Sequence, residues 1–245
     1  MLAALAGCTS ILGGGPSETE LTQNATYEWD TNATASYNVS RSEFTGVVTV
    51  ENSTFVDLYR RGELGNDEPL DVAALQYRYP NGTVVTANDS ALSAETRNSR
   101  LNVSLPQAGG QVAFTADRPT GKQFTTPVFV EGVSHEVTLP PRARVGVPLL
   151  SRVSPSSDST RVVDNRMTIR WEELSRSSLI VRYYLARDLP LFGGLGGVLV
   201  LVGIGGSVYY LRQIRVLKRR REEIAPDVET EDDDFGDDGP PPGMR

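Results

Sequence analysis

The chain has 245 residues, of which 39% are hydrophobic and 22% are charged, with a formal net charge of −7 and one cysteine. A single cysteine excludes an intrachain disulfide framework and a thiolate metal cluster, so packing alone must stabilise any folded part. The negative charge disfavours nucleic acid as a partner, and it says little about the fold.

Residues 1–23 resemble the start of an exported lipoprotein, because Leu5-Ala6-Gly7 before Cys8 forms a bacterial-type lipobox. We expect Cys8 to be lipidated and the residues after it to form a flexible linker. Only seven uncharged residues precede Cys8, so this is a truncated signal peptide without the usual basic region. The alternative is an accidental match, with Cys8 as an ordinary buried cysteine.

Residues 24–187 change to short runs rich in β-branched and aromatic residues, separated by Gly, Pro, Asn and Asp. Pro80-Asn81-Gly82 predicts a hairpin turn that leads to Val84-Val85. The fold class predicted is an antiparallel β-sandwich, and the break at residues 116–126 leaves open whether it forms one unit or two. The expected strands are 44–50, 55–59, 74–79, 101–105, 112–115, 128–130, 136–139, 167–171 and 179–185.

Residues 188–211 predict one transmembrane helix, because Leu189–Leu211 contains no charged residue. At ~1.5 Å per residue these residues span about 34 Å, slightly more than the ~30 Å hydrocarbon core of a bilayer. Asp188 is expected to cap the helix, and Pro190 fits its first turn. We therefore expect a membrane-lipid environment and a single crossing.

The charges after the span predict its orientation. Residues 212–224 should form a basic juxtamembrane helix, and residues 225–245 an acidic, disordered tail. By the positive-inside rule, residues 212–245 are expected to be cytoplasmic and residues 9–188 extracellular. The basic residues are Arg212, Arg215, Lys218, Arg219, Arg220 and Arg221.

Asparagine sequons support an extracellular domain. Of nine asparagines in residues 24–102, seven begin Asn-X-Ser/Thr, whereas the local Ser and Thr content predicts about two by chance. We expect N-glycosylation there, and the alternative is simple crowding of these residues in turns. The seven are Asn24, Asn32, Asn38, Asn52, Asn81, Asn88 and Asn102, of which Asn102, inside an expected strand, is the weakest.

Small residues form a stripe on the expected span, which favours close approach of another helix, either in a homodimer or with a partner span. The alternative is the ordinary glycine content of membrane helices. The acidic tail is either a docking peptide for a cytoplasmic protein or a solubilising segment. The stripe consists of Gly193, Gly196, Gly197, Gly203 and Ser207.

No residue pattern predicts catalysis or a cofactor. His135 follows Ser134, and because neighbours in a strand point to opposite faces, the two cannot form a nucleophile–base pair. We expect His135 to be structural and no metal site to be present. The aspartates at 232–238 superficially resemble a calcium loop but lack its closing glutamate.

Several segments resemble a family of haloarchaeal membrane-anchored proteins that contain a domain of unknown function. They are 42–44, 79–83, 127–132, 145–150, 182–185, 209–215 and 232–245. The low lysine content, two against 22 arginines, fits such a source. The resemblance implies a location in the cell envelope and supplies no activity.

The sequence thus predicts a non-enzymatic protein of the cell membrane. The first hypothesis is an interaction or receptor-like module with a short cytoplasmic tail. The second is a structural lipoprotein associated with the surface layer. An exported hydrolase is a distant third, because the chain offers no paired base and nucleophile.

Overall fold

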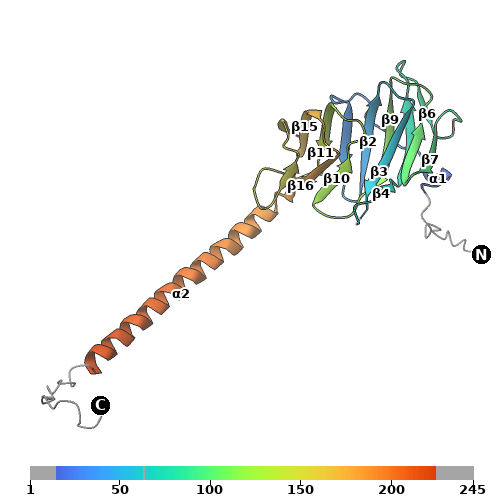
Figure 1. The fold of residues 1–245 in the computed structure, drawn as a ribbon. Helices are drawn as coiled ribbons and strands as arrows, with labels where there is room; N and C mark the ends of the chain where they lie inside the picture. Colours follow the sequence, from blue (N-terminus) through green and yellow to red (C-terminus); the bar gives the residue numbers. More distant parts are fainter. Residues whose placement is uncertain (1–14, 63, 225–245) are drawn as a thin grey trace, which may run out of the picture. The chain divides into compact units, whose positions relative to one another are not determined.

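The structure is a computed structural model that describes residues 15–62 and 64–224. The chain divides into two compact units, Met1–Asp188 and Leu189–Arg245. The first unit is built of β-strands, and the second contains helix α2 (Figure 1). The predicted mainly β fold with one C-terminal helix is therefore confirmed.

The largest sheet of the first unit has eight strands in the order β14-β15-β11-β1-β2-β9-β5-β6. Neighbouring strands are antiparallel except β1 and β11, which are parallel. The strands are β1 (Ala35–Val39), β2 (Glu43–Val50), β5 (Val72–Arg78), β6 (Val84–Thr86), β9 (Gly110–Asp117), β11 (Val133–Thr138), β14 (Ser159–Val163) and β15 (Arg166–Leu174).

Three smaller sheets complete this unit. A four-stranded sheet has the order β4 (Asp67–Pro69), β3 (Phe55–Arg61), β8 (Arg100–Ser104) and β7 (Ser93–Arg97). A three-stranded sheet has the order β10 (Gln123–Pro127), β16 (Ser178–Arg182) and β13 (Arg152–Ser154). β12 (Ala143–Arg144) pairs with β17 (Tyr184–Leu185), and α1 (Glu18–Leu21) is one capped helical turn.

The core lies between the eight-stranded sheet and the smaller sheets. Tyr37 and Phe44 of the large sheet meet Phe124 of β10, with ring centroids 6.1 and 5.1 Å apart. Leu58 and Val103, from the four-stranded sheet, are buried in the same cluster. This two-layer packing is a β-sandwich, and strands from both sides of residues 116–126 belong to its eight-stranded sheet.

Part of the outer face of the large sheet is covered by residues 25–30, here called the strap. Tyr27 packs with Val47, Ala74 and Ala113 in a small second cluster. Its hydroxyl donates to the carbonyl of Ala74 at 2.7 Å. Ala74 has φ +53°, within a bulge of β5 that shifts its pairing with β9. The bulge thus supplies the carbonyl that fixes the strap.

Two glutamine side chains, one from β5 and one from β9, hold the rest of the strap. The Gln76 amide donates to the carbonyl of Ala25 at 2.8 Å, and the Gln111 amide donates to that of Trp29 at 3.1 Å. Side chains of the sheet therefore satisfy backbone groups that no strand pairs with. Packing also begins earlier than the expected boundary at residue 24, since Leu21 of α1 is buried in the main core.

Several expected strands are present, and others differ. The hairpin at Asn81-Gly82 is confirmed, with Gly82 at φ +88°. The expected strand 128–130 is wrong, because Gln123–Pro127 forms β10 instead and residues 128–130 lie in the following connection. The expected strand 179–185 is two strands, since β16 and β17 pair with different sheets on either side of Tyr183.

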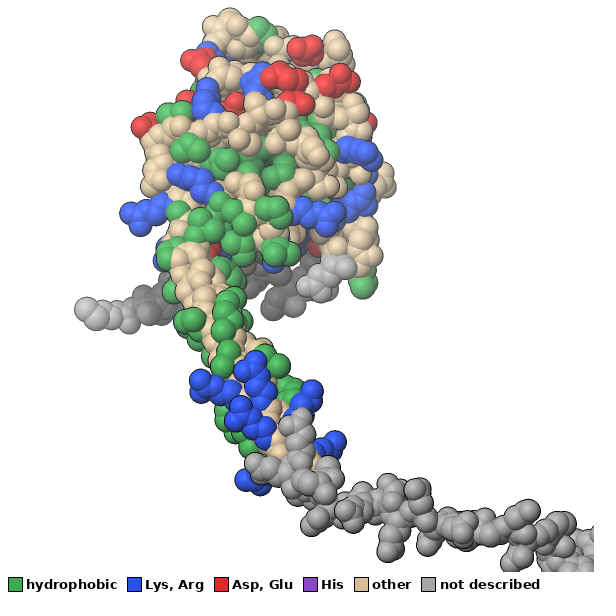
Figure 2. Space-filling view, turned by 90° about the vertical axis from the view of Figure 1, so that its left-hand side faces the viewer, with side chains coloured by type: hydrophobic (Ala, Val, Ile, Leu, Met, Phe, Trp, Pro, Cys, Tyr) green, Lys and Arg blue, Asp and Glu red, His purple; other side chains and the backbone are tan. Residues whose placement is uncertain are grey.

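Helix α2 (Asp188–Ile224) begins at the last residue of the first unit and continues past the apolar stretch of the second unit without a break. Its segment Asp188–Arg221 is long and apolar enough to cross a membrane, and its most apolar 18 residues have a mean hydropathy of 2.0, with none of them buried. Figure 2 shows hydrophobic side chains along the first part of this helix and basic side chains near its far end. The helix therefore has the length and composition of a single-pass anchor.

Candidate functional site

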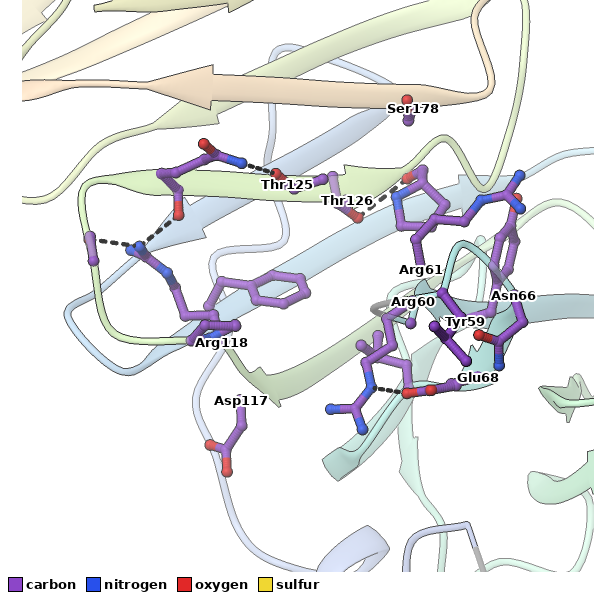
Figure 3. A pocket seen from close by; sticks show the side chains of 18 of the residues that line it. Tyr59, Arg60, Arg61, Asn66, Glu68, Asp117, Arg118, Thr125, Thr126 and Ser178 are labelled. Carbon is purple, nitrogen blue, oxygen red and sulfur yellow. Dashed lines mark hydrogen bonds and ion pairs between the residues drawn. The ribbon is translucent and has the colours of Figure 1, made fainter. Parts of the chain in front are cut away.

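A recess of about 730 Å³ opens between the end of β3 and strand β10 (Figure 3). Thr125, Thr126 and Ser178 line one side, and Tyr59 and Arg60 line the other. The recess lies where the four-stranded sheet and the three-stranded sheet stop beside each other. Its lining combines hydroxyl and guanidinium groups with a larger apolar surface from residues such as Phe44, Leu70 and Pro127, which suits a ligand or partner with both apolar and polar groups.

The charged groups of β3 and β4 are paired with each other. Arg60 lies 3.2 Å from Glu68, and Arg61 lies 3.0 Å from Asp67. Arg100 reaches the same Asp67 at 2.6 Å. These ion pairs fix the β3–β4 side of the recess. Arg60 and Arg61 still remain about half exposed.

Arg118 is the most buried charged group of the recess, at 7% exposure. Its guanidinium donates to the carbonyls of Ser40, Gly121 and Gln123 and to the hydroxyl of Tyr183, at 2.8–3.1 Å. Its acceptors are all neutral, and within the described residues its Nε–H has no partner. A buried cation of this kind is costly unless its donors are satisfied, so Arg118 fixes the connection between β9 and β10.

That connection, residues 118–122, is also bonded to the end of the first unit. The hydroxyl of Tyr183 donates to the carbonyl of Gly121 at 3.0 Å, and the amide of Tyr183 donates to that of Lys122 at 2.9 Å. Lys122 lies 2.7 Å from the carboxylate of Asp188, which also accepts from the Leu185 amide. Asp188 therefore turns back toward the β domain, rather than capping the helix as expected.

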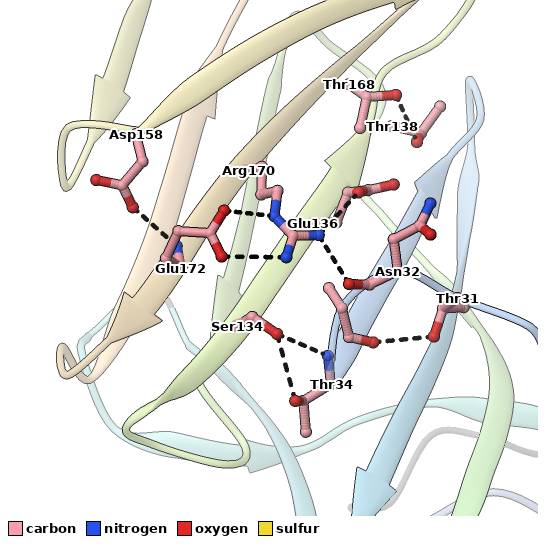
Figure 4. Close-up of polar contacts among 11 residues, drawn as sticks. Thr31, Asn32, Thr34, Ser134, Glu136, Thr138, Asp158, Thr168, Arg170 and Glu172 are labelled. Carbon is pink, nitrogen blue, oxygen red and sulfur yellow. Dashed lines mark hydrogen bonds and ion pairs between the residues drawn. The ribbon is translucent and has the colours of Figure 1, made fainter.

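A second polar region lies on the outer surface of β1, β11, β15 and β14, here called the polar face (Figure 4). One cross-strand row of this face is Ser36, Glu136, Arg170 and Ser159, and the next is Asn38, Thr138, Thr168 and Arg161. Arg170 binds both carboxylate oxygens of Glu172, at 2.8 and 3.1 Å, and donates to the carbonyl of Asn32 at 2.7 Å.

His135 lies on the opposite, inner side of β11, as strand alternation predicts. It is fully buried, and its Nδ1 lies 2.9 Å from the carbonyl of Val133. Burial lowers the pKa of His135, so the neutral ring is favoured. Ser134 instead faces outward, where its hydroxyl accepts from the Thr34 amide at 3.0 Å. His135 is thus structural, and the two residues form no catalytic pair.

The structure places six of the seven sequon asparagines at exposed positions. Asn102 is half-buried in β8, where its amide donates to the carboxylate of Asp57 at 2.7 Å. A depression of about 550 Å³ is lined in part by Asn52, and one of about 480 Å³ by Asn32. The recess has none of the seven in its lining. The exposed six are Asn24, Asn32, Asn38, Asn52, Asn81 and Asn88.

The remaining predicted residues are on α2 or outside the described chain. The small-residue stripe is exposed along α2, and Ser207 donates to the carbonyl of Gly203 at 2.8 Å. The six basic residues from Arg212 to Arg221 are exposed on the same helix. Cys8 and the tail at 225–245 lie outside the described residues. Within residues 15–62 and 64–224, no three His, Cys, Asp or Glu side chains form a metal-binding group.

Sequence reasoning missed the recess, because its walls come from segments far apart in the chain. Tyr59, Arg118 and Thr125 carry no common motif, and none was singled out. The one usable signal was an arginine beside Pro119 and Gly121 in a predicted loop. Burial of that arginine depends on Ser40 and Tyr183, which no local pattern connects to it.

These features define a class of protein: a β-sandwich followed by one helix that is long and apolar enough to cross a membrane. Residues 31–229 match a family of unknown function, DUF5803, and the chain belongs to this family. The match includes the sandwich strands and all of α2. Comparisons with curated proteins and with solved structures find no match.

Proposed function

We propose that this protein is a non-enzymatic, single-pass component of a cell envelope, whose β domain acts as an interaction or receptor-like module. Residues 9–188 lie outside the cell and residues 212–245 inside. Six basic residues directly after the apolar segment support this orientation. The seven sequons, all before that segment, support an exported and glycosylated surface.

One observation carries the receptor-like role: the loop that lines the recess is bonded to the residue where α2 begins. Arg118, Gly121 and Gln123 line the recess. Lys122, in the same loop, binds Asp188 at 2.7 Å. A partner that displaces this loop therefore acts on the first residue of the helix through the Lys122–Asp188 ion pair.

The distribution of sequons supports the recess as the contact site. The depressions beside Asn52 and Asn32 would be covered if those asparagines carried sugars. The recess would stay open, because no sequon asparagine lines it. A partner can therefore reach the recess on a fully glycosylated domain.

Photocrosslinking in native membranes tests this role. A photoreactive residue replaces Thr125 in the recess, and the control replaces Thr160 on the exposed edge strand β14. We expect a discrete adduct with one membrane or envelope protein from position 125 only. Equal adducts from both positions favour the structural lipoprotein, and no adduct from position 125 contradicts the receptor-like role.

The proposal includes two further attachments. A lipid on Cys8 would hold the other end of the β domain at the membrane, and mass spectrometry of the mature N-terminus detects it. The small-residue stripe from Gly193 to Ser207 would contact a second copy or a partner span. An intact Met1 or an unmodified Cys8 peptide contradicts the lipid attachment.

The tail supplies a separate test of recruitment inside the cell. Deleting residues 235–245 should remove a cytoplasmic protein from pull-downs of the full-length protein. An unchanged set of cytoplasmic proteins contradicts recruitment by the tail and leaves the role of the recess untouched.

A further inference from the structure

The polar face is an uncovered sheet surface that is hollowed beside a sequon. A depression of about 480 Å³ is lined entirely by polar and charged residues from three strands and by Asn32. The two cross-strand rows place hydroxyl, carboxylate and guanidinium groups side by side on this surface (Figure 4). Such a surface offers many hydrogen-bond donors and acceptors but little apolar area.

The sequon residue at the rim of this depression is held in place. Arg170 donates to the backbone carbonyl of Asn32 at 2.7 Å. Two residues further on, the Thr34 amide and hydroxyl both lie within 3.3 Å of the Ser134 hydroxyl. The Asn32 residue itself is exposed. The backbone of the sequon is therefore fixed at Asn32 and at Thr34, while Asn32 remains accessible.

A second sequon asparagine belongs to the same face. Asn38 is exposed at the end of the row that continues through Thr138, Thr168 and Arg161. Arg166 donates to its side-chain oxygen. Two of the six exposed sequon asparagines thus lie on or beside the polar face.

We propose that the polar face binds the chain's own glycan, which is attached at Asn32 and lies across β11, β15 and β14. The occupant is a carbohydrate, because sugar hydroxyls both donate and accept hydrogen bonds, as the lining groups do. This inference rests on the proposed exposure of the β domain outside the cell.

Because the sugar is covalently attached, weak polar contacts are enough to keep it on the polar face. A short tether gives an effective concentration on the order of 10 mM, so a sugar with an intrinsic Kd of a few mM occupies the face for most of the time. When the sugar occupies the face for most of the time, local opening of the strands beneath it becomes about threefold less frequent. The free outer edge of β14, whose five residues are all exposed, is the segment that gains most from this cover.

Glycopeptide mass spectrometry and hydrogen exchange of the full-length protein test the inference. The protein is made in its native host, as wild type and as Asn32→Gln, with Asn88→Gln as the matched control. Asn88 is an exposed sequon residue outside the lining of the depression. We expect sugar on Asn32 and about threefold faster exchange of residues 159–163 in Asn32→Gln alone. The same comparison on sugar-free protein from a non-glycosylating host should show no difference, which separates loss of sugar from damage to the fold.

Each other outcome overturns the inference. Sugar on Asn88 with none on Asn32 overturns it and leaves the outside location standing. Sugar on Asn32 with unchanged exchange means that the glycan extends into solvent. Absence of sugar from every sequon also overturns it, and protease cleavage of the β domain in intact cells then reports the location separately.

Discussion

The two halves of the outer face of the eight-stranded sheet are built from different residues. Over β2, β5 and β9 the outward residues include Val47, Ala74 and Ala113, and the strap covers them with Tyr27. Over β1, β11, β15 and β14 the outward rows are polar and uncovered. An apolar half requires cover and a polar half does not, so the strap ends where the sheet surface becomes polar.

The largest test of this difference removes the central side chain of the strap. Tyr27→Ala should lower the free energy of unfolding by about 3–5 kcal/mol, because it deletes a buried aromatic ring and leaves the Ala74 carbonyl without its donor. Chemical denaturation of the full-length protein in detergent measures the change. A loss below about 1 kcal/mol would mean that the strap adds little to the sheet.

The free energy of unfolding should depend on pH through Tyr27, which lies over the covered half of the sheet. Burial raises the pKa of Tyr27 to about 12 from an ordinary value of 10.0. The folded state thus favours the protonated phenol, and this stabilisation is complete below pH 10 and is lost as pH rises toward 12. The expected loss is about 2–3 kcal/mol, and Tyr27→Phe should remove that part of the pH dependence. Identical pH profiles for the two proteins contradict the assignment.

A smaller effect is expected at the bonds that hold the rest of the strap. Gln76→Ala removes the donor to the Ala25 carbonyl and should cost about 1 kcal/mol in the free energy of unfolding. Limited proteolysis should then cut near residues 23–26 before other sites. Cleavage at the same rate as in wild type would show that the strap stays in place without this bond.

The smallest effect is expected on the uncovered half. Arg170→Ala removes the ion pair with the exposed Glu172 and the bond to Asn32, and should cost about 0.5–1 kcal/mol in sugar-free protein. Thermal unfolding of Arg170→Ala and of Tyr27→Ala, measured under the same conditions, compares the two losses of stability. A loss as large as that for Tyr27→Ala contradicts the difference between the two halves.

The sequence predicted most of what depends on local pattern. Alternating β-branched residues located β2, β3 and β15, and Asn81-Gly82 located the turn between β5 and β6. The uncharged stretch located the apolar part of α2. Hydropathy and turn signals suffice here because each element is decided by its own residues.

Other features depend on distant partners and were missed. Gln123–Pro127 lies in a region with Pro and Gly, yet it pairs with β16, more than fifty residues away. The strap shows no hydrophobic periodicity of a strand, because its backbone bonds to side chains rather than to another strand. The recess depends in the same way on Arg118, which is buried only because Tyr183 and Ser40 approach it.

The proposed orientation has the β domain, with its recess, outside the cell and the end of α2 inside. Thr125→Cys places a thiol at the recess, and Gln213→Cys places one after the apolar segment. Intact cells are treated with a membrane-impermeant maleimide, and labelling is read peptide by peptide. We predict labelling at position 125 in intact cells and at position 213 only after permeabilisation. Labelling of position 213 alone in intact cells would contradict this orientation.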